Sequence, residues 1–253
     1  MTQSPRAAEA ADSLRADGFQ VGYLTEDGAE LRVPLAEAWT VAFEHGTPVR
    51  RFVSRKGQRH LSGLWWSSST GGHVGFESWL ERDNLMWLDF DPTVVGIASQ
   101  PFWLRWTGEA GEQASHAPDF FARRADGSAV VIDCRPVERR KPRDVAKFDA
   151  TARACALVGW EYRLLGAPEA VETENVRWLA GYRHPRHRLP ESVEALRRVF
   201  ATPTPLMAGA EAAGDPIAVL PVLFHLLWSH ELTADVSVPL HPETLVSPAA
   251  GTR

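Results

Sequence analysis

The sequence predicts an α/β fold in which helices flank a mixed sheet. Between residues 75 and 165 the patterns follow the order helix, four strands, helix, strand, as in a layered α/β domain. The best local support comes from PDFFAR and AVVIDCR, which are separated by ADGS. An Asp-Gly pair between apolar runs is a strong hairpin signal, and the second run is apolar enough for a buried strand.

The segments before this core are expected to be a flexible tail and a small β-rich segment. Residues 1–18 are rich in Ala and polar groups and predict a flexible tail. Residues 19–65 predict a β-rich N-terminal segment with short strands at FQVGYL, AELRVPL and PVRRFVS, the first two joined by a turn at Asp27-Gly28. The small residues of SSSTGG (67–72) suggest a flexible joint before the core.

The core itself is expected over residues 66–168. Helical spacing predicts a helix from Gly75 to Phe90, which Asp91-Pro92 ends. VVGIAS and FWLRW then read as strands, residues 107–115 as a turn, residues 141–157 as a helix and WEYRLL as the last strand.

The tail, residues 169–250, has a different pattern. Three helices are expected, at 191–200, 204–213 and 216–232, followed by extended pieces at ADVSVPL and ETLVS. Three helices before a β-hairpin is the order of a winged helix-turn-helix, which commonly binds DNA or another protein. A plain helical appendage is the alternative.

Composition excludes several classes of protein. No apolar run reaches the roughly 20 residues of a membrane span, and the N-terminus has no apolar signal region, so a cytoplasmic protein with no membrane partner is expected. Two cysteines give neither a disulfide framework nor a zinc motif. The net charge of −5 does not favour nucleic acid, but residues 121–147 carry eight bases against four acids.

Polar side chains at the strand ends form the candidate catalytic site. Hydrolysis of a phosphodiester requires a carboxylate-held metal, an activated water and a cation. Asp119 opens one strand of the hairpin and Asp133 lies near the end of the other. Arg135, two residues further on, shares the face of Asp133 because the side-chain period of a strand is two. Glu81 on the preceding helix could complete the set.

Each of these acids also has a structural interpretation. Asp119 follows Pro118 and could be a turn residue, and Glu81 alone would be an ordinary solvated helix residue. Asp133 interrupts a buried apolar run, where a carboxylate is costly unless it is paired or bound to a metal.

Together these motifs resemble the PD-(D/E)xK restriction-endonuclease-like nucleases, and more closely the TnsA-type endonuclease subunit of heteromeric, Tn7-like transposases. The similarity lies in ESWLERDNLMWL, DPTVVGIASQP, HAPDF and VIDCRP. It implies Glu81, Asp119, Asp133 and Arg135 as catalytic residues. The three acids would be ligands of Mg²⁺, for which Mn²⁺ may substitute. Glu77 is an alternative to Glu81, and His116 an accessory residue.

The resemblance also implies function and partners. The chain would be an endonuclease that nicks double-stranded DNA at transposon ends, together with a DDE-type transposase subunit and an AAA+ regulator. A stand-alone nuclease of defence or repair, or a non-catalytic DNA-binding or assembly homologue, are the alternatives.

The sequence departs from the family at one position, because Arg135 stands where the pattern has Lys. Arginine keeps the charge but places it differently, so Lys141 or Lys147 of the next helix could reach the site instead. The basic run Arg139, Arg140, Lys141 and Arg143 is the expected DNA-binding surface. No serine-hydrolase, nucleotide-phosphate or dinucleotide motif is present.

Overall fold

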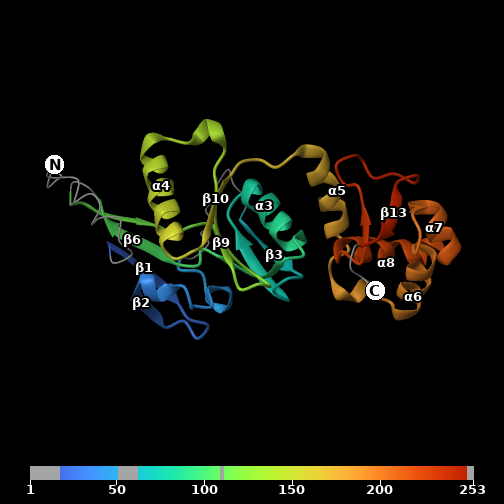
Figure 1. Cartoon of the computed structure of the whole chain (residues 1–253), viewed down its shortest axis with the longest axis horizontal. Coiled ribbons are helices and arrows are strands. Elements are labelled where there is room, and N and C mark those ends of the chain that lie inside the picture. The colour runs from blue at the N-terminus through green and yellow to red at the C-terminus, as the bar shows by residue number, and fades with distance from the viewer. Residues whose placement is uncertain (1–17, 51–61, 109–110, 250–253) are drawn as a thin grey trace, which may run out of the picture. The chain divides into compact units, whose positions relative to one another are not determined.

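The computed structural model describes residues 18–50, 62–108 and 111–249, which fall into two compact units (Figure 1). Unit 1 holds residues up to 85 and 93–167, and unit 2 holds 86–92 and the chain from 168 onward. Both units contain helices and sheets, so the mixed α/β class is confirmed. Almost all of the expected N-terminal tail lies outside the described residues.

The central sheet of unit 1 has the strand order β10-β9-β8-β5. These strands are β5 (Val94–Ser99), β8 (Phe120–Arg124), β9 (Ala129–Cys134) and β10 (Glu161–Leu165). β10 runs parallel to β9, whereas the other pairs are antiparallel, so the sheet is mixed as predicted. The hairpin is confirmed: Phe120 pairs with Ile132, and Gly127 turns the chain at φ +85°, a conformation that favours glycine.

Two helices belong to this part of the chain. α4 (Pro142–Leu157) lies beside β10 (Figure 1). It buries Phe148, Ala150 and Ala154, and the two alanines join a core that also contains Val131 of β9. α3 (Trp79–Phe90), whose residues from Met86 onward fall in unit 2, begins four residues later than predicted, because residues 72–76 form a strand.

The N-terminal strands do not form a separate β-rich segment, as was predicted for residues 19–65. They belong to a second sheet of order β2-β1-β6-β7. Its strands are β1 (Phe19–Leu24), β2 (Glu30–Pro34), β6 (Trp103–Thr107) and β7 (Gln113–His116). FWLRW was expected in the sheet of VVGIAS, but β6 pairs instead with β1, and the turn expected at 107–115 contains most of β7. Local propensity marks a strand but does not determine its partner.

The expected joint at 67–72 is also a different structure. It is the turn of a hairpin between β3 (Gly63–Ser67) and β4 (Gly72–Phe76), with Gly71 at φ +65°. Along the chain, the short helices α2 (Leu35–Ala38) and η2 (Phe43–His45) lie between β2 and this hairpin. The third expected strand, PVRRFVS, is not a strand at 48–50, and its remainder lies outside the described residues.

Unit 2 contains four α-helices in the described residues after position 168: α5 (Ala170–Ala180), α6 (Pro190–Val199), α7 (Leu206–Ala213) and α8 (Pro216–Trp228). A short η4 (Pro185–His187) precedes α6. The antiparallel sheet has the order β11-β13-β12, from β11 (Thr204–Pro205), β12 (Leu232–Ala234) and β13 (Leu245–Pro248). α5 was not expected, and of ADVSVPL only its first residue, Ala234, lies in a strand.

The helices of unit 2 pack around their own core, which includes Leu196, Phe200, Val222 and Leu223, all at most 1 % exposed. Gly209 of α7 allows Phe200 to approach, because a Cβ there would lie 2.2 Å from its ring. Across the described ranges, no helix is both long and apolar enough to span a bilayer.

Candidate active site

Asp119 stands immediately before β8, beside the end of β9. Its carbonyl oxygen accepts a hydrogen bond from the Gln100 backbone N–H (2.9 Å), and its Oδ2 accepts one from the Cys134 backbone N–H (2.7 Å). Burial, and then repulsion from Asp133 and Glu81, raise the pKa of the Asp119 carboxyl well above its ordinary value. A nearby cation would therefore be strongly favoured at this position.

Glu81 closes the first turn of α3. The Glu81 N–H donates to Ser78 Oγ (3.2 Å), and that hydroxyl donates to Glu81 Oε1 (2.9 Å). Oε2 accepts from the Glu77 backbone N–H (2.7 Å). The residues from Ser78 to Glu81 thus cap α3 much as a capping box does, with the Glu77 backbone N–H in place of that of Ser78, and such caps fix where a helix starts. Burial is the main cause that raises the pKa of Glu81, so the same carboxylate both caps the helix and adds to the charge around Asp119.

Asp133 is buried at the end of β9 and is only 2 % exposed. His116 Nε2 of β7 lies 2.8 Å from its Oδ1 and 3.0 Å from its Oδ2. The Tyr162 hydroxyl of β10 donates to Oδ2 (2.8 Å), and burial followed by the charge of Asp133 raises the pKa of that tyrosine. Two protein groups therefore already satisfy the carboxylate that the sequence left unexplained.

The three predicted acids are electrostatic neighbours but do not converge on one point. Asp133 and Glu81 both act on Asp119. Among the described residues, however, no group of three or more His, Cys, Asp or Glu side chains is arranged to hold a metal ion. Mg²⁺ commonly uses only one or two carboxylates and keeps several waters. Asp119 together with Glu81 fits that chemistry, because their repelling charges would be relieved by a dication.

The predicted cations lie toward the start of α4. Arg135 Nη2 is 3.6 Å from Asp144 Oδ2, and the arginine side chain is 42 % exposed. Arg140 donates to the Arg135 and Leu164 carbonyl oxygens, which uses its guanidinium to hold the strand ends. The other predicted bases, on η3 (Val137–Arg139) and around α4, are exposed: Arg139, Lys141, Arg143 and Lys147.

Three residues at this site escaped the sequence analysis. Tyr162 contacts Asp133 from β10. Arg50, far upstream, forms an ion pair with Glu77 (2.6 Å). Gln100 is 1 % exposed and has φ +46°. Its buried Oε1 has no hydrogen-bond partner in the part of the chain that the structure describes. The Gln100-Pro101 pair was visible as a break between strands, but no sequence pattern connects Arg50 or Tyr162 to the acids.

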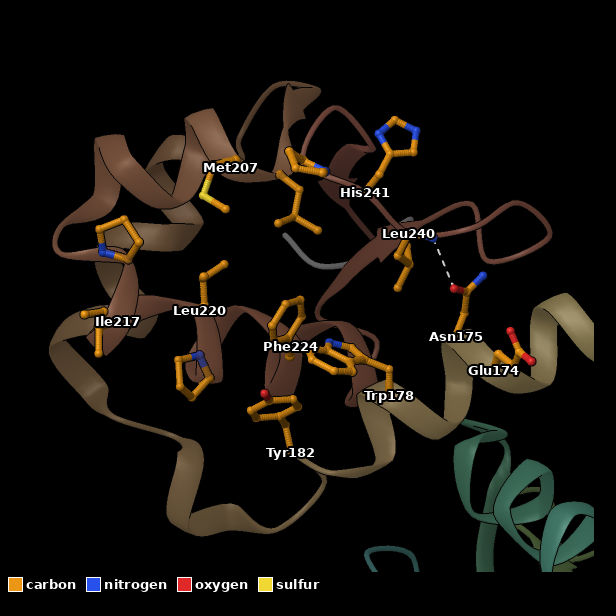
Figure 2. Close-up of a pocket in the computed structure, with 14 residues that line it drawn as sticks. Glu174, Asn175, Trp178, Tyr182, Met207, Ile217, Leu220, Phe224, Leu240 and His241 are labelled. Carbon is orange, nitrogen blue, oxygen red and sulfur yellow. Dashed lines mark hydrogen bonds between the residues drawn. The ribbon is translucent and has the colours of Figure 1, made fainter.

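A second candidate site is a groove of about 660 Å³ in unit 2 (Figure 2). Side chains of α5, α7 and α8 line it, including Trp178 and Phe224, whose rings meet edge to face at 5.9 Å. Leu240 closes one side, and its backbone N–H donates to Asn175 Oδ1 (3.1 Å). Ile217 is 86 % exposed, and α8 contains no Lys, Arg, Asp or Glu.

Comparison with known protein families finds a match to part of the chain. Residues 91–166 match the family described as TnsA-like endonuclease N terminal. The matched segment includes His116, Asp119, Asp133 and Arg135, whereas Glu81 precedes it. The search of curated proteins found no match to the chain. The family match agrees with the resemblance that the sequence motifs suggested and is consistent with a TnsA-type endonuclease.

Proposed function

We propose that this chain is the endonuclease subunit of a heteromeric, Tn7-like transposase and nicks DNA at transposon ends. The observation that carries the proposal is the match of residues 91–166. That segment contains Asp119 and Asp133, which adjoin the paired ends of β8 and β9. In this reading α3, β5, β8, β9, α4 and β10 form a restriction-endonuclease-like core.

The chemistry of this core is hydrolysis of a phosphodiester. The oxygen of water adds to phosphorus, one ester P–O bond breaks, and the leaving oxygen gains a proton while water loses one. Asp119 and Glu81 would hold Mg²⁺ or Mn²⁺, which would lower the pKa of a bound water and neutralise phosphate charge. Asp133 supports the site by holding His116 and Tyr162, and it could exchange these partners to become a third ligand. The exposed bases near α4 would contact the DNA backbone.

A plasmid-nicking assay tests this function. The full chain with Mg²⁺, together with the purified partner transposase where nicking requires it, should convert supercoiled plasmid to open circles. Asp119→Ala should reduce the rate at least about a hundredfold, the scale of losing a principal electrostatic group. Equal nicking by both proteins would remove Asp119 from the mechanism. No nicking by the wild type, with or without the partner, would favour a non-catalytic assembly subunit.

That alternative has one observation in its favour. Arg135 forms an ion pair with Asp144, and Asp133 forms hydrogen bonds with His116 and Tyr162. Such contacts are expected where these residues stabilise the fold and do not take part in catalysis. The stand-alone nuclease is distinguished by the neighbouring genes. A gene for a DDE-type integrase beside this one favours transposition, whereas a methyltransferase or helicase gene favours defence or repair.

The order α6, β11, α7, α8, β12, β13 supports a winged-helix-like domain in unit 2. DNA recognition by its last helix would need Lys or Arg side chains, and α8 has neither. The apolar groove instead suits an apolar segment of a protein, and the partner transposase subunit is the occupant that the proposed function supplies.

Substitution of Ile217 tests this docking surface. Ile217→Glu places a charge at an exposed position that lines the groove, so folding should be preserved. Affinity for the purified transposase subunit, measured by calorimetry, should fall at least about tenfold, which corresponds to roughly the burial of one large apolar side chain.

The matched control is Ala218→Glu, which is exposed on the same helix but does not line the groove. It should bind the partner as the wild type does. A change in the sedimentation of the isolated Ile217→Glu protein would instead indicate that a second copy of the chain fills the groove. A loss of duplex binding with partner binding intact would indicate DNA.

A further inference from the structure

The segment that carries Arg50 is linked by hydrogen bonds, through Gln100, to the backbone of Asp119. The Val49 N–H donates to the Gln100 carbonyl oxygen (3.0 Å), and the Gln100 N–H donates to the Asp119 carbonyl oxygen (2.9 Å). Three chain segments that are distant in sequence therefore meet at the strand end where the carboxylate stands. Arg50 follows directly after the anchored Val49, so its backbone position is set by the site.

The guanidinium of Arg50 forms an ion pair with Glu77, which in turn contacts the Glu81 carboxylate. Its Nη2 lies 2.6 Å from Glu77 Oε2, and the backbone N–H of Glu77 donates to Glu81 Oε2 (2.7 Å). One residue thus separates the guanidinium from the Glu81 carboxylate. The Arg50 side chain is 45 % exposed and the Glu77 side chain 27 %. An ion pair with this much exposure is weak, so the guanidinium can exchange Glu77 for a stronger anion.

Arg50, rather than Arg135, acts on the acids of the site. Its positive charge lowers the pKa of both Glu81 and Asp119, against the burial that raises them. Arg135 instead contacts Asp144 at the start of α4. Within the described residues, Arg135 stands at the position where the family pattern has Lys, and its guanidinium pairs with Asp144.

Gln100 shows that this junction is held under strain. A left-handed backbone is rare and unfavourable for glutamine, and Gln100 adopts φ +46°. Its Oε1 is buried without a hydrogen-bond partner among the described residues, which is also unfavourable. Strained and unsatisfied groups concentrate at functional sites, and here they connect the Arg50 segment to Asp119.

We propose that Arg50 is a catalytic residue which binds the scissile phosphate beside Asp119 and Glu81, and so supplies the positive charge that the family pattern assigns to position 135. This inference rests on the proposed endonuclease function. A guanidinium can bind two phosphate oxygens at once. On DNA binding, Arg50 would exchange Glu77 for the phosphate and stabilise the negative charge of the transition state.

The experiment compares Arg50→Ala, Arg50→Lys and Arg135→Ala in the full chain, with Arg32→Ala as the matched control. Arg32 is an exposed arginine of β2 in the same unit. Two quantities are measured for each protein: the Mg²⁺-dependent nicking rate, and the affinity for an uncut duplex in Ca²⁺ as a function of salt. Thermal melting verifies folding.

Arg50→Ala should lower nicking at least about a hundredfold, and Arg50→Lys should restore part of it. The slope of log affinity against log salt should fall by about one phosphate contact. Arg135→Ala should lose less activity than Arg50→Ala, and Arg32→Ala should behave as the wild type does.

The proposal is overturned if Arg50→Ala matches Arg32→Ala in both measurements, or if Arg135→Ala causes the larger loss. It is also overturned if the wild type binds no duplex. Failure of the endonuclease function looks different: Asp119→Ala would nick as fast as the wild type, while the salt dependence still decides whether Arg50 contacts phosphate.

Discussion

Replacing Asp119 by asparagine should abolish nicking and make the protein more stable. Asparagine keeps an oxygen that can accept the hydrogen bond from the Cys134 N–H, but it carries no charge to be buried beside Asp133 and Glu81. Removing such an unfavourable group should raise the free energy of unfolding by about 0.5–2 kcal/mol. A catalytic carboxylate is expected to cost stability in this way.

The stability gain should depend on pH. Because the pKa of Asp119 is raised in the folded protein, the folded state holds that proton more tightly than the unfolded chain does. The wild-type free energy of unfolding therefore falls as the pH rises from the ordinary carboxyl range through the raised pKa. Asparagine does not titrate, so the advantage of the variant should be larger at pH 8 than at pH 5.

Urea unfolding at the two pH values provides the measurement, with nicking assayed on the same preparations. Asp149→Asn, at an exposed position of α4, is the control and should change the free energy of unfolding by no more than about 0.5 kcal/mol. A variant less stable than the wild type at both pH values would mean that the Asp119 carboxylate is structural.

Replacing Asp133 by alanine should strongly destabilise the protein. The change deletes a carboxylate that is 2 % exposed, leaves the Tyr162 hydroxyl without its acceptor and removes the partner of His116. Lost hydrogen bonds and a small cavity together cost about 2–4 kcal/mol. Reduced nicking by this variant would then report unfolding as well as any loss of a metal ligand.

Tyr162→Phe distinguishes the two effects. It removes one donor to Asp133 and leaves the carboxylate in place, so the free energy of unfolding should fall by about 1.5–3 kcal/mol, as for a hydrogen bond to a charged group. Asp133→Ala with an unchanged urea midpoint would refute the structural role and return Asp133 to the metal site.

Sequence patterns predicted those parts of unit 1 that depend on local interactions. The Asp-Gly turn and the two apolar runs gave the β8–β9 hairpin, and the register Phe120↔Ile132 places Asp119 opposite Asp133. The helix that carries Glu81 was also predicted, although its start was placed at Gly75 and α3 begins at Trp79. The hydrogen bonds between Ser78 and Glu81 show that the S-x-x-E motif also has a structural role.

Long-range pairing accounts for the differences. β6 was recognised as a strand but placed in the wrong sheet, because its partner β1 lies more than 80 residues earlier. The extended piece expected at 234–240 is mostly irregular: the Asn175 side chain binds the carbonyl oxygens of Val236 and Val238. A side chain of α5 replaces the strand partner there.

By itself, the sequence determined the fold class of the protein and its candidate catalytic acids. Turn chemistry, strand alternation and a buried Asp are local properties that one stretch of chain displays. Only the tertiary structure decided what each acid contacts: His116 and Tyr162 hold Asp133, and the anchored Val49 segment brings Arg50 toward Glu81 and Asp119. These contacts join residues far apart in the chain, and packing of the whole unit selects them.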